Sequence, residues 1–263
     1  MKILSAINAA DSLSPNHFTL DEKLMWCNEV TTAIRRGVKK SYKTLDTVIT
    51  SAEDICIPED INVSDIEMVF IDGRPIDKAD FRSLPFLNHG EILSGYGINF
   101  SSPKNLRLVC LDMPKEIRDI DIRGEFKTDA NCIYGCELPF FEGDCIKIFP
   151  FEDLDAEPNL TDAAETYVVS NDGEKIMLSD DILTPETAAY LEIKRVIDDE
   201  TEADPPYDRM YIEYILAKGA LYQHDYDSYT AHMVQYNNLF DEFKRDYKTR
   251  NPLTDMAGFH NYW

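Results

Sequence analysis

A heptad pattern of aromatic residues near the end of the chain constrains the fold more than any other feature. After Asp225, apolar residues recur at alternating steps of three and four to about Lys248, which predicts a long amphipathic helix. These residues, the aromatic seam, are Tyr226, Tyr229, Met233, Tyr236, Phe240, Phe243 and Tyr247. Asp225 occupies the N-cap position and Pro252 closes the helix. Since a shorter helical pattern runs from Tyr207 to Tyr222, the sequence predicts a helical hairpin.

A second helical region is predicted at the other end of the chain. Thr19-Leu20-Asp21-Glu22 matches a capping box, and apolar residues then recur at helical spacing. The pattern predicts a helix over residues 19–43, with a short helix over 3–10 before it. Basic residues fill the last turns of the longer helix, where the negative end of the helix dipole favours cations. They are Arg35, Arg36, Lys39, Lys40 and Lys43.

The middle of the chain, from about 55 to 200, has short β-like runs separated by Gly, Pro and Asx residues. The predicted strands are Glu67–Ile71, Leu106–Leu111, Ile117–Phe126, Cys145–Phe149, Thr166–Ser170 and Glu174–Leu178. Turns are predicted at 72–73, 95–97 and 171–173 because glycine tolerates positive φ. Residues 184–197 fit either a helix or a strand, and we favour a strand after Tyr190. Residues 198–206, which end in two prolines, predict a linker.

These elements predict an α+β fold in which the N- and C-terminal segments form a helical bundle with a β-rich insertion between them. The expected divisions are 1–54 for the N-terminal helical part, 55–200 for the insertion, 201–250 for the C-terminal hairpin and 251–263 for an extended docking tail. No internal repeat is visible in the sequence.

The charge of the chain bounds its partners. Forty-nine acidic and 26 basic residues give a formal charge of −23, so binding to DNA by general charge is excluded. A negative channel wall nevertheless lets a duplex slide past without adhering. The sequence has neither the apolar leader expected for export nor a run long enough to span a membrane, so we expect the protein to remain in the cytoplasm where it is made.

Catalytic, cofactor and metal motifs are not recognisable. Cys132, Cys136 and Cys145 lack histidines at zinc-ligand spacing, so buried thiols are the expected state. The acidic stretch 151–204 contains no calcium-binding loop, and Gly95-Tyr96-Gly97 is too short for a phosphate-binding loop. We therefore expect a non-enzymatic protein without cofactor or metal. The alternative to a non-enzymatic protein is a cysteine- or metal-containing module in the β-rich part.

Three groups of residues are candidates for contacts with other subunits. The first is the basic group Arg35, Arg36, Lys39 and Lys40, for which a solvated helix end is the alternative. The second is Tyr226, Tyr229 and Tyr236, whose hydroxyls favour a partly buried face, with an ordinary core as the alternative. The third is the aromatic tail Phe259, Tyr262 and Trp263, which predicts docking into a groove on another chain or packing on its own domain.

Several segments resemble a known family. Leu24-Met25-Trp26-Cys27-Asn28-Glu29-Val30, followed by the basic helix end, is similar to the opening helix of the head-to-tail connector proteins of tailed bacteriophages, also called adaptor or head-completion proteins. The segments 207–215, 224–229 and 236–244 are similar to the closing hairpin of that group. The resemblance covers about 90 residues and rests on the placement of aromatic residues rather than on an invariant motif.

The resemblance implies a structural protein of the phage neck. Such a protein forms a ring, with 12 copies expected, that joins the portal protein to the tail or to a stopper protein, and genomic DNA passes through its channel without sequence-specific binding. No catalytic residue is implied. The middle region is larger than in small members of the group, so the resemblance does not imply which protein this region contacts. A different virion protein, such as a tail-completion or stopper subunit, is the alternative.

Overall fold

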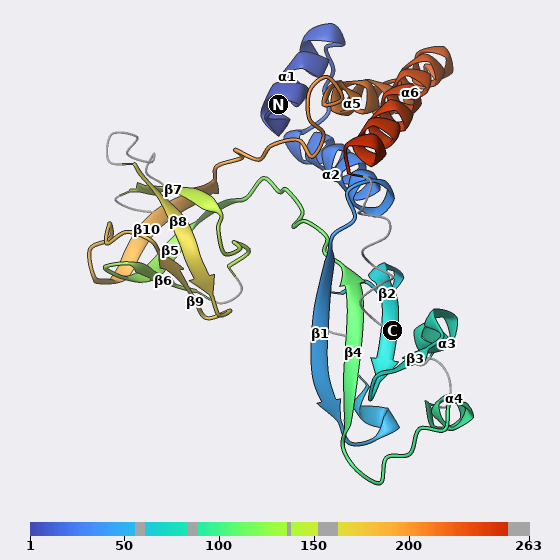
Figure 1. Cartoon of the computed structure of the whole chain (residues 1–263). Coiled ribbons are helices and arrows are strands. Elements are labelled where there is room, and N and C mark those ends of the chain that lie inside the picture. Colours follow the sequence, from blue (N-terminus) through green and yellow to red (C-terminus); the bar gives the residue numbers. More distant parts are fainter. Residues whose placement is uncertain (56–60, 84–88, 136–137, 152–162, 252–263) are drawn as a thin grey trace. The chain divides into compact units, whose positions relative to one another are not determined.

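The computed structural model describes residues 1–55, 61–83, 89–135, 138–151 and 163–251. The fold is α+β, as the sequence predicted, because helices from both ends of the chain pack together and the middle is rich in β-strands. Figure 1 shows the helices and strands of the chain. The chain divides into two compact units. Unit 1 comprises Met1–Thr31 with Glu116–Phe243, and unit 2 comprises Thr32–Lys115 with Lys244–Trp263.

The helices of unit 1 come from both ends of the chain. They are α1 (Ile3–Leu13), α2 (Leu20–Gly37), α5 (Arg209–Tyr222) and α6 (Tyr226–Arg250), of which α2 and α6 continue into unit 2. The predicted capping box is present, since Thr19 and Glu22 each accept a hydrogen bond from the backbone N–H of the other. Asp225 caps α6 by accepting from the Ser228 N–H at 3.1 Å. α1 packs against α5, and Thr31 of α2 bonds to Tyr211 of α5.

The helix predicted over residues 19–43 is wrong at its C-terminal end. α2 ends at Gly37, and residues 42–49 form strand β1 (Tyr42–Ile49). The cations of the helix end suggested a longer helix, but Leu45, Thr47 and Ile49 alternate with period two, and the whole strand pairs with β4 (Lys104–Leu111). Long-range pairing therefore overrides the local pattern.

Unit 2 contains a four-stranded antiparallel sheet. Its order is β1-β4-β2-β3, with β2 at Ile66–Ile71 and β3 at Arg74–Ile76. The predicted turn between β2 and β3 has positive φ at Asp72 and Gly73. One face of the sheet packs against Phe81 and Leu93 in a single apolar core. The remaining elements of this unit are η1 (Ala52–Asp54), η2 (Val63–Asp65), α3 (Lys78–Ser83) and α4 (His89–Gly95).

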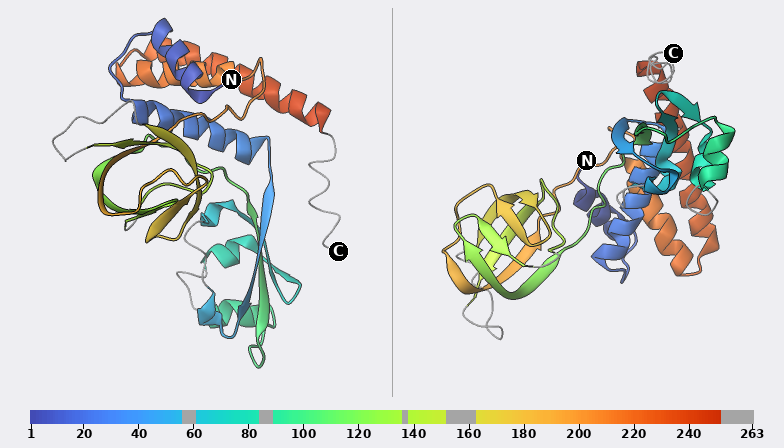
Figure 2. Two further views of the ribbon diagram at one scale, coloured as in Figure 1. Left: turned by 90° about the vertical axis from the view of Figure 1, so that its left-hand side faces the viewer. Right: turned by 90° about the horizontal axis from the view of Figure 1, so that it is seen from below.

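The β-strands of unit 1 form a closed antiparallel barrel (Figure 2). Its order is β10-β5-β6-β9-β8-β7, and β10 closes the barrel by pairing with both β5 and β7. The strands are β5 (Asp121–Asp129), β6 (Cys132–Tyr134), β7 (Cys145–Pro150), β8 (Ala164–Asn171), β9 (Lys175–Leu178) and β10 (Glu186–Arg195). Branched aliphatic side chains fill the interior, including Ile133, Ile146, Ile176 and Ile193, each fully buried.

Two strand boundaries differ from the sequence prediction. β5 begins at Asp121 rather than at Ile117, and Asn28 pins Ile117 instead, through hydrogen bonds to its backbone N–H and C=O. β10 begins at Glu186, ahead of Tyr190, and an irregularity in its pairing with β5 follows Glu186. The segment 184–197, which fitted either a helix or a strand, is therefore a strand from Glu186 to Arg195.

The predicted linker is ordered by the beginning of the chain. The Ile3 N–H donates to the Asp199 carbonyl at 2.9 Å, and Lys2 forms a β-bridge with Glu200. Arg195, at the end of β10, bonds to Asp144 of the barrel at 2.9 Å and to Asp199 at 3.2 Å. Arg195 and Asp144 are nearly buried, with side chains 10% and 7% exposed. The end of the barrel is therefore fixed to the linker by one guanidinium group.

Across the described ranges, no helix combines the length and the apolar character needed to cross a bilayer.

Candidate interaction surfaces

The contacts between the helices of unit 1 include buried polar groups. Thr31 and Tyr211 share a hydrogen bond at 2.8 Å between residues 180 positions apart. Glu213 is only 4% exposed, and its carboxylate meets Arg209 at 3.1 Å and His232 of α6 at 2.9 Å. Buried polar atoms cost free energy unless they are paired, so these bonds select one arrangement of α2, α5 and α6.

A second polar cluster joins α2, α5 and α6. Glu29 accepts a hydrogen bond from the Tyr214 hydroxyl and pairs with Lys218 at 2.7 Å. The ring of Tyr214 lies 4.9 Å from the ring of Tyr236. Burial, followed by the hydrogen bond to Glu29, raises the pKa of Tyr214 above its ordinary range. Burial also raises the pKa of Tyr236, to about 12, and that of Tyr211.

Because these tyrosines are buried or half-buried, we expect a cooperative loss of helix at alkaline pH. An unfolded tyrosine ionises near pH 10, whereas Tyr211, Tyr214 and Tyr236 hold their protons longer in the fold. Their contribution to stability is complete below about pH 10 and falls as the pH rises towards 12, by up to about 1.4 kcal/mol per pH unit for a buried phenol such as Tyr211. Circular dichroism and tyrosinate absorbance, recorded together, check this expectation.

Exposed tyrosines should ionise first without loss of helix, and the buried ones should ionise as the helices unfold. Tyr236→Phe should make the alkaline transition less steep because it removes one of the titrating groups. A single titration of all 14 tyrosines near pH 10 with helix content unchanged would contradict the expectation.

The aromatic seam of α6 is only partly covered. Tyr236 and Phe243 are buried, and Phe243 lies against Tyr207 with ring centroids 5.4 Å apart. Tyr229 is half-buried, whereas Tyr226 is 62% exposed. The structure therefore brings Tyr236 into the contact with α5 and leaves Tyr226, near the start of α6, at the surface.

A cluster of aromatic residues that the sequence reading did not single out lies between α2 and α5. Trp26 is 1% exposed, stacks on Tyr222 with centroids 5.8 Å apart and meets the edge of Phe18 at 5.2 Å. Its indole N–H has no acceptor among the residues described. Only the helical spacing of Trp26 relative to Cys27 and Val30 could have placed it in the core.

The basic residues near the end of α2 have different environments. Arg35 and Arg36 occupy the last turn of the helix, and Arg36 makes a bidentate contact with Asp65 at 2.8 and 3.1 Å. Lys39 and Lys40 follow the helix, and Lys43 belongs to β1. We call this segment, Arg35 to Lys43, the basic turn. The dipole argument therefore applies to the two arginines only.

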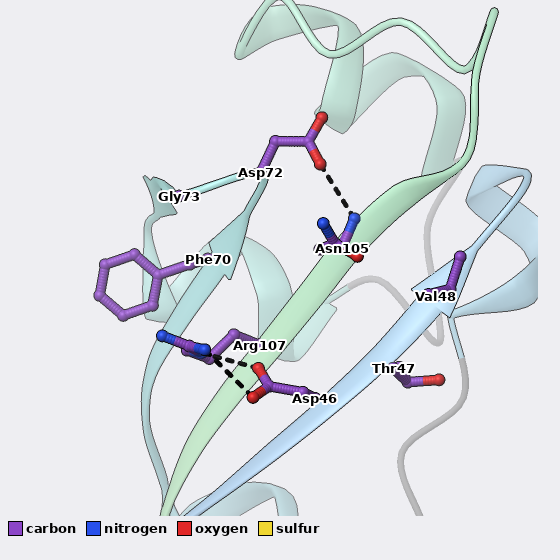
Figure 3. Close-up of a pocket in the computed structure, with 8 residues that line it drawn as sticks. All are labelled: Asp46, Thr47, Val48, Phe70, Asp72, Gly73, Asn105 and Arg107. Carbon is purple, nitrogen blue, oxygen red and sulfur yellow. Dashed lines mark hydrogen bonds and ion pairs between the residues drawn. The ribbon is translucent and has the colours of Figure 1, made fainter.

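The open face of the unit 2 sheet carries a shallow hollow of about 790 Å³ (Figure 3). Arg107 lies between Phe70 and Asp46 across three adjacent strands, and its guanidinium meets the Asp46 carboxylate at 2.7 and 3.1 Å. The pKa of Asp46 is lowered, first by this hydrogen bond. The Asp72 carboxylate accepts the Asn105 N–H at 2.9 Å. The Asp46 and Arg107 side chains that line the hollow are therefore paired with each other, and Asp72 is paired with Lys104 at 2.8 Å.

Of the three cysteines predicted to be buried thiols, Cys132 is confirmed and Cys145 is only half-buried. Cys27, Cys110 and Cys132 are buried, and Cys145 is half-buried. Burial raises the pKa of Cys27 to about 12, so its thiol is protonated and unreactive at neutral pH. No group of three or more potential metal ligands is found in the described ranges. Cys56 and Cys136 lie outside those ranges.

Charge is distributed unevenly between the two units. Unit 1 contains 35 acidic and 11 basic residues, a formal charge of −24, and unit 2 contains 14 acidic and 15 basic residues, a charge of +1. The negative charge of the chain therefore belongs to unit 1, which includes the barrel. The aromatic tail Phe259, Tyr262 and Trp263 lies outside the described residues.

No family model, curated protein or solved structure matches this chain.

Proposed function

We propose that the protein is a structural subunit of a bacteriophage neck that forms a ring joining the portal protein to the tail. The observation that carries the proposal is the helical group itself. Segments from the two ends of the chain, which resemble the opening and closing helices of head-to-tail connector proteins, pack together through Thr31 and Tyr211. A chain of this kind presents helices for contacts with other subunits, and the barrel and sheet for contacts with further partners.

The surface chemistry supports a role in assembly. Tyr226 and Tyr222 are 62% and 57% exposed near the turn between α5 and α6, and tyrosine is enriched at protein interfaces because its ring packs while its hydroxyl stays hydrated. The net charge of −23 is suited to a channel wall along which DNA moves without being retained. Genomic DNA is thus a passing partner in the proposal.

Mass measurement of the chain with and without its portal protein tests the proposal. We expect a complex that contains one ring of portal and one ring of this chain, with 12 copies of each. Tyr226→Ala should weaken that complex, whereas Thr230→Ala, a smaller change at an exposed position one helical turn away, should leave it intact. A chain that stays monomeric and does not bind the portal would overturn the proposal.

A stopper or tail-completion subunit is a second candidate, favoured by the closed barrel, which is a separately built β-structure with its own core. Truncation after Asn251 distinguishes the two functions. In the neck ring, removal of the aromatic tail Phe259, Tyr262 and Trp263 is expected to abolish attachment to the portal. Attachment that survives the truncation, together with loss of tail joining when the barrel surface is altered, would favour the stopper.

A further inference from the structure

The outer wall of the barrel carries an apolar strip with acidic residues at both ends. Burial alternates along β8, so Val168 points into the core while Tyr167 and Val169 point outward, 56% and 46% exposed. Met177 of the adjacent strand β9 also lies between two core residues and faces outward. β7, β8 and β9 lie side by side in the barrel wall (Figure 1). We call this surface the β8 strip.

The rim of the β8 strip is negative. Asp172 and Glu174 are exposed in the turn between β8 and β9, and Asp180 and Asp181 are exposed after β9. The Asp180 carboxylate accepts a hydrogen bond at 3.0 Å from the hydroxyl of Thr166, a buried residue of β8. Hydrogen bonds from Ser179 and, to a lesser extent, from Thr166 lower the pKa of Asp180. The rim is therefore charged at neutral pH.

The cations of the barrel wall offset this rim only in part, because the charge of Lys175 acts on Asp172 while Lys147 and Lys194 are paired elsewhere. Lys147 pairs with Glu165 at 3.2 Å, and Lys194 pairs with Asp121 and Glu192. Lys175, the basic residue next to the β8–β9 turn, lies over the ring of Tyr134 at 5.9 Å. A complementary surface must therefore bring its own positive charge and an apolar centre.

The basic turn of unit 2 has both properties. Lys40 is exposed beside Tyr42, whose side chain is 44% exposed, and Arg35, Arg36, Lys39 and Lys43 lie within a few residues of it in the chain. Residues 35–43 contain five cations and no carboxylate, and one of the five, Arg36, is paired with Asp65. It is complementary in sign to the β8 strip and similar to it in having an aromatic centre.

We propose that the basic turn of one copy docks on the β8 strip of a second copy, an inference that rests on the proposed function. The two surfaces differ, so the contact is head-to-tail and propagates from copy to copy, as a ring requires. Unit 1 has a charge of −24 and unit 2 a charge of +1. A contact between unit 1 of one copy and unit 1 of another, or between unit 2 of one copy and unit 2 of another, therefore gains no electrostatic attraction.

A charge exchange between the two surfaces tests the contact. In one variant Lys39→Glu and Lys40→Glu make the turn acidic, and in the other Glu174→Lys and Asp181→Lys make the rim basic. Each variant alone should associate with itself on the order of 100-fold more weakly than the original chain at low ionic strength, because like charges meet. The mixture should associate again, as alternating copies of the two variants visible by native mass spectrometry.

Control variants separate this contact from general charge and from misfolding. Arg74→Glu with Lys115→Glu makes the same charge change at exposed positions of unit 2 and should leave association unchanged. Tyr167→Ser should weaken association without a change in circular dichroism, since the ring is mostly outside the fold.

Self-association of either charge variant at the original strength would overturn the contact, as would a mixture that does not recover although both variants are folded. A monomeric original chain at low salt and high concentration would also overturn it. Binding to the portal, measured separately, decides the proposed function in each of these cases.

Discussion

Trp26→Ala is expected to lower the free energy of unfolding of unit 1 by about 3–5 kcal/mol, the cost of removing a large aromatic side chain from a core. Trp26 is 1% exposed and contacts Phe18 and Tyr222. Its removal leaves a cavity between α2 and α5, which join the two ends of the chain. Chemical denaturation followed by far-ultraviolet circular dichroism measures the effect, with the two units allowed separate transitions.

Two further substitutions identify the cause. Met25→Ala, at the preceding helix position but 49% exposed, should cost less than about 1 kcal/mol. Trp26→Phe keeps an aromatic ring and removes an indole N–H that has no acceptor among the described residues, so the regained desolvation energy should offset part of the lost packing. Equal losses from Met25→Ala and Trp26→Ala would mean that Trp26 is not a core residue.

Arg195→Ala is expected to destabilise the barrel by about 3 kcal/mol, because it leaves the buried Asp144 carboxylate without its cation. Arg195 is 10% exposed and lies between Asp144, which is 7% exposed, and Asp199. The adjacent Lys194 is also ion-paired, but it is 43% exposed. Lys194→Ala should therefore cost less than about 1 kcal/mol. Thermal unfolding of both variants provides the comparison.

A second substitution should rescue part of the loss. Asp144→Asn in the Arg195→Ala background removes the uncompensated charge, and the amide oxygen still accepts the Phe141 N–H that Asp144 holds at 2.7 Å. The double variant should therefore be more stable than Arg195→Ala alone. If the second substitution instead adds a further loss, the guanidinium contributes through packing rather than through charge.

Local patterns in the sequence predicted much of the fold. The seam of α6, the Thr19 capping box and the glycine turns at 73 and 173 each depend on residues a few positions apart, and the structure has all of them. The strands β2, β4, β7, β8 and β9 are also present near their predicted positions. Short-range signals of this kind are independent of how the rest of the chain folds.

The parts that the sequence reading missed depend on distant residues. The predicted helix ran into the first two residues of β1, Tyr42 and Lys43, and the rest of the strand was not predicted, because its partner β4 lies more than 50 residues away. The single β-rich region that we expected contains two structures, a sheet and a barrel, and no composition shift marks the change between them. Barrel closure by β10, paired with both β5 and β7, is likewise invisible in a local pattern.

The candidate contact residues were only partly accessible from the sequence. The basic group near residue 36 was identified, but its ion pair with Asp65 was not. The outward positions of Tyr167 and Val169 follow from burial alternation in β8, which becomes meaningful only when the barrel interior is known. The sequence shows that the chain is acidic as a whole. The formal charges of −24 on unit 1 and +1 on unit 2 could be assigned only once the structure had defined the two units.

The barrel and the sheet differ in how readily a strand of another chain can add to them. Within the described residues every barrel strand has a neighbour on both sides, so the barrel offers side chains alone to a colliding molecule. The sheet ends in β1 and β3, and β1 has exposed Val48 beside charged Asp46. When many copies are made at once, unwanted strand addition is therefore expected at β1, with Asp46 and Lys43 acting as its protection, while the barrel surface stays free for specific docking.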